Sequence, residues 1–83
     1  MKINDQVILQ KLGKSFVAYD NNNSVFHEFN DVGYVIIKGV EKGDSMNKIV
    51  KNIMKDFEVT KDQALSDVEE FLAELEKKDL ITR

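Results

Sequence analysis

Short runs of β-branched and aromatic residues fill the first third of the chain. They occupy residues 7–12, 15–19 and 24–29, and the segments between them are rich in glycine, asparagine and aspartate, which tolerate the backbone of tight turns. The pattern predicts three strands in an antiparallel β-meander over about residues 5–29. A sheet of three strands with one apolar face needs a cover, so we expect the rest of the chain to pack on it.

From Asn30 onward, apolar residues recur at the spacing of a helix. Asn30 is suited to cap a helix with Asp31 in its first turn, and Gly43 is suited to end it. Residues 34–37 (YVII) would by themselves fit a buried strand. The cap and the glycine favour a helix of about 10 to 13 residues. Its apolar positions are Val32, Val35, Ile36 and Val40.

The next segment has one continuous apolar stripe at helical spacing. Asp44 or Ser45 caps it, and lysines lie on the opposite face. We interpret Met46 and Met54 as core residues rather than as an adaptable binding surface. The stripe comprises Met46, Ile49, Val50, Ile53, Met54 and Phe57.

A longer helix is predicted over residues 60–79. Thr60 followed by Gln63 fits a capping box, in which each side chain bonds the other residue's backbone amide. The apolar arc is wide, so that one line can pack on the preceding helix and the other can face the sheet or a groove beside it. The first line is Leu65, Val68, Leu72 and Leu75, and the second is Ala64, Val68, Phe71 and Leu75. Leu80 and Ile81 return to strand-like chemistry and predict a short final contact.

The order of these elements predicts an α+β fold of the winged helix-turn-helix type. An N-terminal three-stranded meander is followed by three helices over about residues 30–79. A chain of 83 residues with 42% apolar content has the size and core of one domain, residues 1–83. Cysteine is absent, and no apolar run is long enough for a signal peptide or a transmembrane helix. We therefore expect a cytoplasmic protein.

Charge argues against the commonest ligand of this architecture. The final helix lies where a recognition helix would, yet it has three lysines against seven carboxylates. Phosphates would repel such a helix, and their neutralisation supplies most of the affinity for nucleic acid. The net charge of −3 also disfavours anionic membranes. We expect neither nucleic acid nor membrane as a partner.

The sequence offers no constellation for catalysis or metal binding. His27 is the only histidine and has no thiol or triad partner, so we interpret it as structural. The oxygen donors of residues 20–24 resemble a calcium loop, but its sixth and twelfth positions hold Val25 and Asp31 instead of glycine and glutamate. No glycine-rich phosphate loop is present. We expect no catalytic residue, no metal and no cofactor.

Residues 24–29 would form an edge of the meander, and they contain no proline or lysine to blunt it. Two interpretations stay open from the pattern. Either the last helix covers this edge, or an extended peptide adds to it as a further strand and places side chains in the groove beside the helix.

Nearly the whole chain resembles the coenzyme PQQ synthesis protein D family in the order and spacing of its motifs. Residues 29–36 (FNDVGYVI) resemble the family's Leu-Asn-Glu-x-Gly/Ala-x-x-Ile-Trp stretch, and Gly43 resembles the glycine closing its first helix. The chain departs from the family at Phe29, which replaces a leucine, in residues 34–37, which lack tryptophan, and at Asp79, which replaces a glycine. Further along the chain, the family's second helix, third helix and closing apolar pair have counterparts in residues 49–53, 59–68, 71–75 and 80–81.

The resemblance implies a non-catalytic recognition element for ribosomally synthesised, post-translationally modified peptides. Such modules hold the leader segment of a precursor peptide and present its core to a modifying enzyme, such as a radical SAM enzyme, a cyclase or a leader peptidase. The leader pairs with the third strand of the meander and lies against the third helix. Carried over, the strand positions are Ser24, Val25, Phe26, His27, Glu28 and Phe29, and the groove positions are Ala64, Asp67, Val68, Phe71 and Leu75.

Two other functions stay open at this stage. One is a winged-helix DNA-binding regulator, against which the acidic helix argues. The other is a protein-interaction subunit of a larger enzyme complex that takes no peptide ligand. The resemblance is also compatible with a homodimer.

Overall fold

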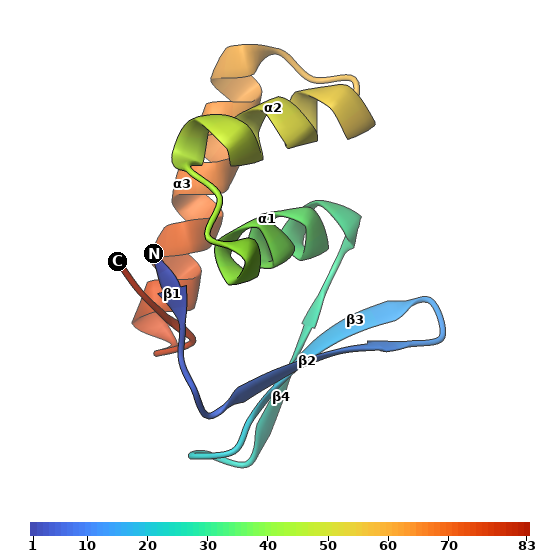
Figure 1. Ribbon diagram of the computed structural model, residues 1–83. Helices are drawn as coiled ribbons and strands as arrows, with labels where there is room; N and C mark the ends of the chain where they lie inside the picture. The colour runs from blue at the N-terminus through green and yellow to red at the C-terminus, as the bar shows by residue number, and fades with distance from the viewer.

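The computed structural model describes all residues from Met1 to Arg83 and contains a three-stranded sheet, three helices and a two-stranded ribbon. The helices lie together above the sheet, and the two ends of the chain lie side by side (Figure 1). This arrangement confirms the predicted α+β winged helix-turn-helix with an N-terminal meander. The elements are β1 (Lys2–Ile3), β2 (Val7–Leu12), β3 (Ser15–Asp20), β4 (Val25–Phe29), α1 (Asp31–Lys42), α2 (Met46–Asp56), α3 (Lys61–Lys77) and β5 (Ile81–Thr82).

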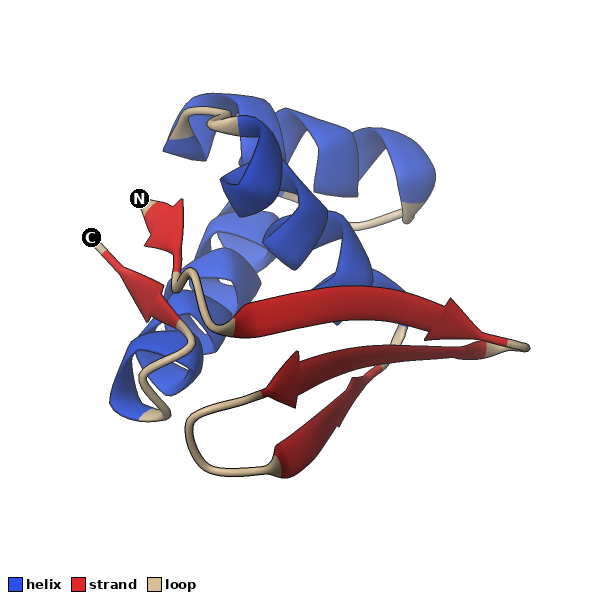
Figure 2. Ribbon diagram, turned by 60° about the horizontal axis from the view of Figure 1, so that its bottom comes forward, coloured by secondary structure: helices blue, strands red, loops and turns tan.

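The sheet is antiparallel in the order β2-β3-β4, so that β3 is central and β4 is an edge. Its register pairs Ala18 with His27 and Phe16 with Phe29. The helices cover one face of the sheet (Figure 2). Ala18 is fully buried on that face, and on the opposite face Phe26 keeps 62% of its surface exposed.

The turn between β3 and β4 is closed by its own side chains. The Asp20 carboxylate accepts the backbone N–H of Asn22 at 2.9 Å and the side-chain amide of Asn23 at 2.8 Å. The Asn23 amide in particular holds the pKa of the Asp20 carboxyl below its usual value. Ser24 lies in this turn with a φ of 54°, so the prediction that β4 begins at Ser24 is wrong by one residue.

Residues 34–37 are helical, which settles their ambiguity between helix and strand. The Asn30 side chain accepts the backbone N–H of Gly33 at 2.8 Å, as its cap prediction requires. At the other end, Gly43 has a φ of 79°, and its N–H reaches the carbonyls of Gly39 and Val40. Ile36 and Ile37 are almost fully buried, and their packing outweighs the weak strand preference of β-branched residues.

The cap of α3 is half of the predicted box. The Thr60 hydroxyl accepts the backbone N–H of Gln63 at 3.1 Å, but the Gln63 side chain donates to Asp67 at 2.8 Å instead of returning to Thr60. The helix ends at Lys77, two residues before the predicted limit.

Beyond α3 the chain turns through a left-handed residue. Asp79 has a φ of 58°, its N–H reaches the carbonyl of Glu76, and the N–H of Leu80 reaches the carbonyl of Leu75. These two bonds form a Schellman motif, whose left-handed position is usually glycine. The turn directs Leu80 and Ile81 into the core, where both are almost fully buried, and this confirms the predicted final contact. Its partner strand β1 was not predicted.

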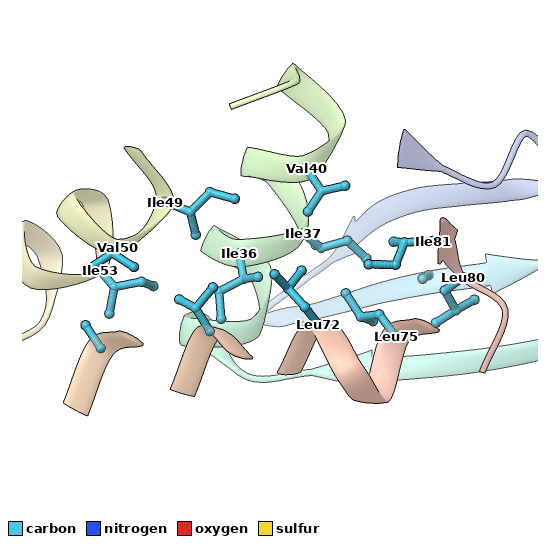
Figure 3. Packing of buried hydrophobic residues seen from close by; sticks show 13 residues of the cluster. Ile36, Ile37, Val40, Ile49, Val50, Ile53, Leu72, Leu75, Leu80 and Ile81 are labelled. Atoms are coloured by element: carbon cyan, nitrogen blue, oxygen red, sulfur yellow. The ribbon is translucent and has the colours of Figure 1, made fainter. Parts of the chain in front are cut away.

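The core lies between the three helices, the ribbon and the inner face of the sheet. Figure 3 shows aliphatic side chains of α1, α2, α3 and the C-terminal pair Leu80 and Ile81 pointing toward one another, and Ala18 adds the contribution of the sheet. Two predicted core positions lie at its margin, since Leu65 is 41% exposed and Met54 is 38% exposed. Each is adjacent on its helix to the buried line but just outside the arc that faces the other helices. The buried cluster comprises Ala18, Ile36, Ile37, Val40, Ile49, Val50, Ile53, Ala64, Val68, Leu72, Leu75, Leu80 and Ile81.

None of the three helices combines the length and the apolar character that a crossing of the bilayer demands.

Candidate functional site

The strand β4 has one side bonded to β3 and one side open. The backbone N–H of Asn21 donates to the carbonyl of Gln6 at 2.9 Å, which continues the β2–β3 register. Because the backbone groups of successive residues point to opposite sides of a strand, those of Phe16, Ala18 and Asp20 point toward β4. Their β4 partners are Phe29, His27 and Val25.

The remaining two residues of β4 therefore present their backbone groups to the open side. Phe26 and Glu28 each offer an N–H donor and a C=O acceptor in the plane of the sheet. No other strand pairs there, and Val25 and Phe26 expose 41% and 62% of their surfaces. The interpretation in which the last helix covers this edge is wrong.

The helix α3 approaches β4 only near the strand's end. There the rings of Phe29 and Phe71 meet edge to face, with 5.5 Å between their centroids. Gly33 of α1 lies beneath this contact, and a Cβ at that position would come within 2.9 Å of the Phe71 ring. Glycine at residue 33 therefore allows the Phe71 ring to approach α1 closely.

A groove of about 510 Å³ runs between the end of β4, α1 and α3. The groove has an apolar floor and a polar, mostly charged rim. The floor is formed by Phe29, Val32, Gly33, Ile36, Phe71 and Leu75, and the rim by Glu28, Asn30, Asp67, Glu70, Glu74 and Lys78.

The structure brings five of the predicted site residues together in this groove, namely Glu28, Phe29, Asp67, Phe71 and Leu75. Phe26 lies beside it on the open edge.

The other predicted positions lie elsewhere. Val25 and His27 belong to β4 but turn their backbone groups toward β3, and Ser24 lies in the preceding turn. Ala64 and Val68 are fully buried and do not line the groove, which corrects their prediction as groove walls. Both face the packed core because the wide apolar arc of α3 directs its middle toward the other helices.

Several groove residues were missed from the sequence. Glu70, Glu74 and Lys78 share a face of α3 with Asp67 and Phe71, since these positions are three or four residues apart. That spacing was available as a signal. Gly33 falls on the Gly/Ala position of the family stretch, which indicated a small residue there but not its contact with Phe71.

The groove is suited to bind an extended chain. Open donors and acceptors on β4 match the backbone of an added strand, and the apolar floor can receive side chains on one face of it. Among the groove residues there is no serine, cysteine or histidine to act as a nucleophile or base. No group of three His, Asp or Glu side chains is arranged to hold a metal ion.

Comparison with known proteins adds a family and two similar structures. The family model of coenzyme PQQ synthesis protein D (PqqD) matches residues 15–81. The structure of TbiB1 in complex with the TbiA(beta) leader peptide is 26% identical in sequence and has a TM-score of 0.88, with 96% of this chain and 93% of that chain covered.

A second structure, lasso peptide synthetase B1 complexed with the leader peptide, is 15% identical and has a TM-score of 0.90. The match covers 99% of this chain and 96% of that chain, and at this identity it establishes a shared fold. No curated protein matches the chain.

Proposed function

This chain belongs to the coenzyme PQQ synthesis protein D family, and we propose that it captures the leader segment of a ribosomally synthesised precursor peptide by β-strand addition. In this role it is a binding protein without catalysis of its own. It presents the precursor to a modifying enzyme, of a class such as the radical SAM enzymes, cyclases or leader peptidases. It acts in the cytoplasm, where the precursor is made.

One observation carries the proposal, namely the unpaired backbone of Phe26 and Glu28 beside an apolar groove. An exposed edge of this kind is a template for another strand, and small proteins normally blunt it. The similarity to TbiB1, whose structure contains a leader peptide, supports assigning the edge to a peptide.

The composition of the groove supports a binding role over a catalytic one. Its polar groups are carboxylates, one amide and one ammonium, and general acid–base work requires a group positioned next to a reactive partner. Main-chain hydrogen bonds give affinity in strand addition, while the pockets for alternate side chains give selectivity. A short segment bound in this way loses chain entropy, so we expect dissociation constants of about nanomolar to micromolar.

The test first identifies a precursor peptide from a short reading frame in the neighbourhood of the gene for this chain. Its leader half and its core half are synthesised separately with a fluorescent label, and anisotropy is measured against the purified protein. The leader should bind and the core should not. Binding of the core alone, or of neither half, would contradict leader capture.

Presentation to an enzyme needs a second measurement. A modifying enzyme identified in the same gene neighbourhood is pulled down with this protein, with and without the precursor. The proposal predicts that the precursor joins the complex through this protein. An enzyme complex that forms and excludes the precursor would favour a subunit that takes no peptide.

A further inference from the structure

The rim of the groove has a marked excess of negative charge. Glu28 lies on the β4 side, and Asp67, Glu70 and Glu74 lie along α3 on the other side. Lys78 is the only cation among the lining residues, and its Nζ lies 3.7 Å from the Oε2 of Glu74. Four carboxylates therefore share one ammonium.

No other cation forms an ion pair with this rim, and Lys14, the cation that shares a neighbouring hollow with Glu28, lies on the sheet side. Glu28, Asp67 and Glu70 form no ion pair. The ion pairs of Lys2, Lys38 and Arg83 are with carboxylates outside the groove. The single further contact of these carboxylates is the Gln63 amide, which donates to Asp67 at 2.8 Å.

The spacing along α3 places these carboxylates close enough to repel one another. Glu70 follows Asp67 by three residues and precedes Glu74 by four, so each neighbouring pair shares one side of the helix. Like charges at this spacing destabilise a helix modestly. A cation entering the groove would remove this repulsion and gain attraction from the carboxylates of α3. Glu28, whose side chain points to the outer face of the sheet, adds negative charge at the β4 side.

The register of β4 indicates which ligand side chains meet this rim. Directly opposed residues on neighbouring strands turn their side chains to the same face. Ligand residues opposite His27 and Phe29 therefore point to the helix side, where the groove lies, and those opposite Phe26 and Glu28 point to the outer face. Of the ligand side chains on that face, those near Phe29 reach the groove, which lies at the end of β4.

Two such side chains meet different chemistry. One of them reaches the apolar floor at Phe29 and Phe71. The next ligand side chain on the same face lies two residues further along the ligand, about 7 Å away. Asp67 and Glu74 each lie about one helical turn, or about 5.4 Å, from Phe71, which is a comparable distance. Where the ligand continues along α3 from Phe71, the second side chain therefore lies among the carboxylates.

We propose that the groove selects a cationic peptide segment in which a large apolar residue and a Lys or Arg, two positions apart, both face α3. This proposal rests on the proposed function and names the class of leader that the site takes.

The experiment selects ligands from a display library of random 12-residue peptides on the purified protein at low salt. Three variants are selected in parallel. Phe26→Pro removes an open-edge amide, Glu70→Lys reverses a rim charge, and Glu76→Lys makes the same charge change on the opposite side of α3, outside the groove. Circular dichroism verifies that each variant is folded.

The expected result is enrichment of Lys or Arg two positions from a large apolar residue with the wild type and with Glu76→Lys. This enrichment should disappear with Glu70→Lys, and no peptide should be enriched with Phe26→Pro. In a selected peptide, Lys→Glu should weaken binding about tenfold at low salt and less at high salt, since salt screens charges at a rim.

Failure of the charge inference and failure of the proposed function have different signatures. Peptides that depend on the Phe26 amide but show no basic preference would overturn the charge inference alone. Peptides enriched equally by wild type and Phe26→Pro, or no enriched peptide at all, would overturn strand addition and the inference with it.

Discussion

The ring of Phe29 meets the ring of Phe71 edge to face, with centroids 5.5 Å apart. Phe29 ends β4 and Phe71 lies midway along α3, so this contact joins the two sides of the groove at its floor. Edge-to-face pairs add about 0.5–1.5 kcal/mol beyond the area they bury. The position of Phe71 in turn depends on Gly33, which leaves room for the ring.

The substitution Gly33→Ala should therefore disturb the groove through Phe71. The added methyl would lie 2.9 Å from the ring, so the ring must shift. Overpacking of this kind costs about 1–3 kcal/mol, and leader binding should weaken. Urea unfolding and peptide titration measure the two effects.

The double variant Gly33→Ala/Phe71→Leu is the control for this mechanism. A smaller side chain at residue 71 should remove the clash, so the loss of stability should be less than the sum of the two single losses. Additive losses would show that Gly33 and Phe71 do not interact as described.

A second prediction concerns the left-handed residue after α3. Asp79 has a φ of 58° at a position that favours glycine. Asp79→Gly should raise the free energy of unfolding by about 1 kcal/mol, because glycine adopts this conformation without a steric cost. Asp79→Ala is the matched control and should be no more stable than the wild type, since aspartate tolerates the left-handed region better than alanine. A glycine variant less stable than the wild type in urea would contradict this reading of the turn.

A third prediction follows from the closed turn between β3 and β4. Hydrogen bonds led by the Asn23 amide lower the pKa of the Asp20 carboxyl from 3.8. A carboxyl with a lower pKa in the folded state stabilises the fold above its unfolded pKa, and this contribution is lost as the pH falls through the folded value. The contribution of Asp20 should therefore be intact at pH 5 to 7 and decline below pH 3.8.

Unfolding midpoints in urea at pH 7 and at about pH 3 measure the effect. Asp20→Asn should be less stable than the wild type at pH 7, and the difference should shrink at the lower pH. The matched control is Asp5→Asn, which changes an exposed carboxylate. Its stability difference from the wild type should not shrink between pH 7 and about pH 3 as that of Asp20→Asn does. An Asp20→Asn difference that is constant with pH would contradict the role assigned to the carboxylate.

The sequence predicted most of the fold because local chemistry and tertiary packing agree. Asn30 and Thr60 begin helices, and Gly43 ends one, as their side chains and backbone freedom require. The pattern was least decisive where packing decides the outcome, as at Leu65 and Met54, since helical spacing alone does not fix how far around a helix the core extends.

The site was harder to predict than the fold. The open edge came from the strand order, and Phe71 came from the apolar spacing of the last helix. Their assignment to a peptide site came from the family resemblance, and the contact between Phe29 and Phe71 was not predicted. The contact of Gly33 with Phe71 and the pairing of the strand β1 had no signal in the sequence, because each joins segments far apart in the chain. Val68 was placed in the groove because its spacing fits both faces of a wide apolar arc, which only the packing of α3 can separate.

The central claim is that a leader peptide bonds to the open backbone of β4. Phe26→Pro removes one outward N–H and leaves the bonds to β3 in place, and edge strands accommodate proline at such positions. Phe26→Ala is the control, because it removes the same ring but keeps the amide. The N–H of His27 faces β3, so the substitution His27→Pro should instead destabilise the sheet itself.

The most direct measurement is titration of the labelled leader against wild type, Phe26→Pro and Phe26→Ala, each shown to be folded by circular dichroism. We predict that the proline variant binds at least about tenfold more weakly than the alanine variant, since a hydrogen bond is lost and the ring obstructs the incoming strand. Equal affinity of the two variants for the leader would contradict strand addition at β4.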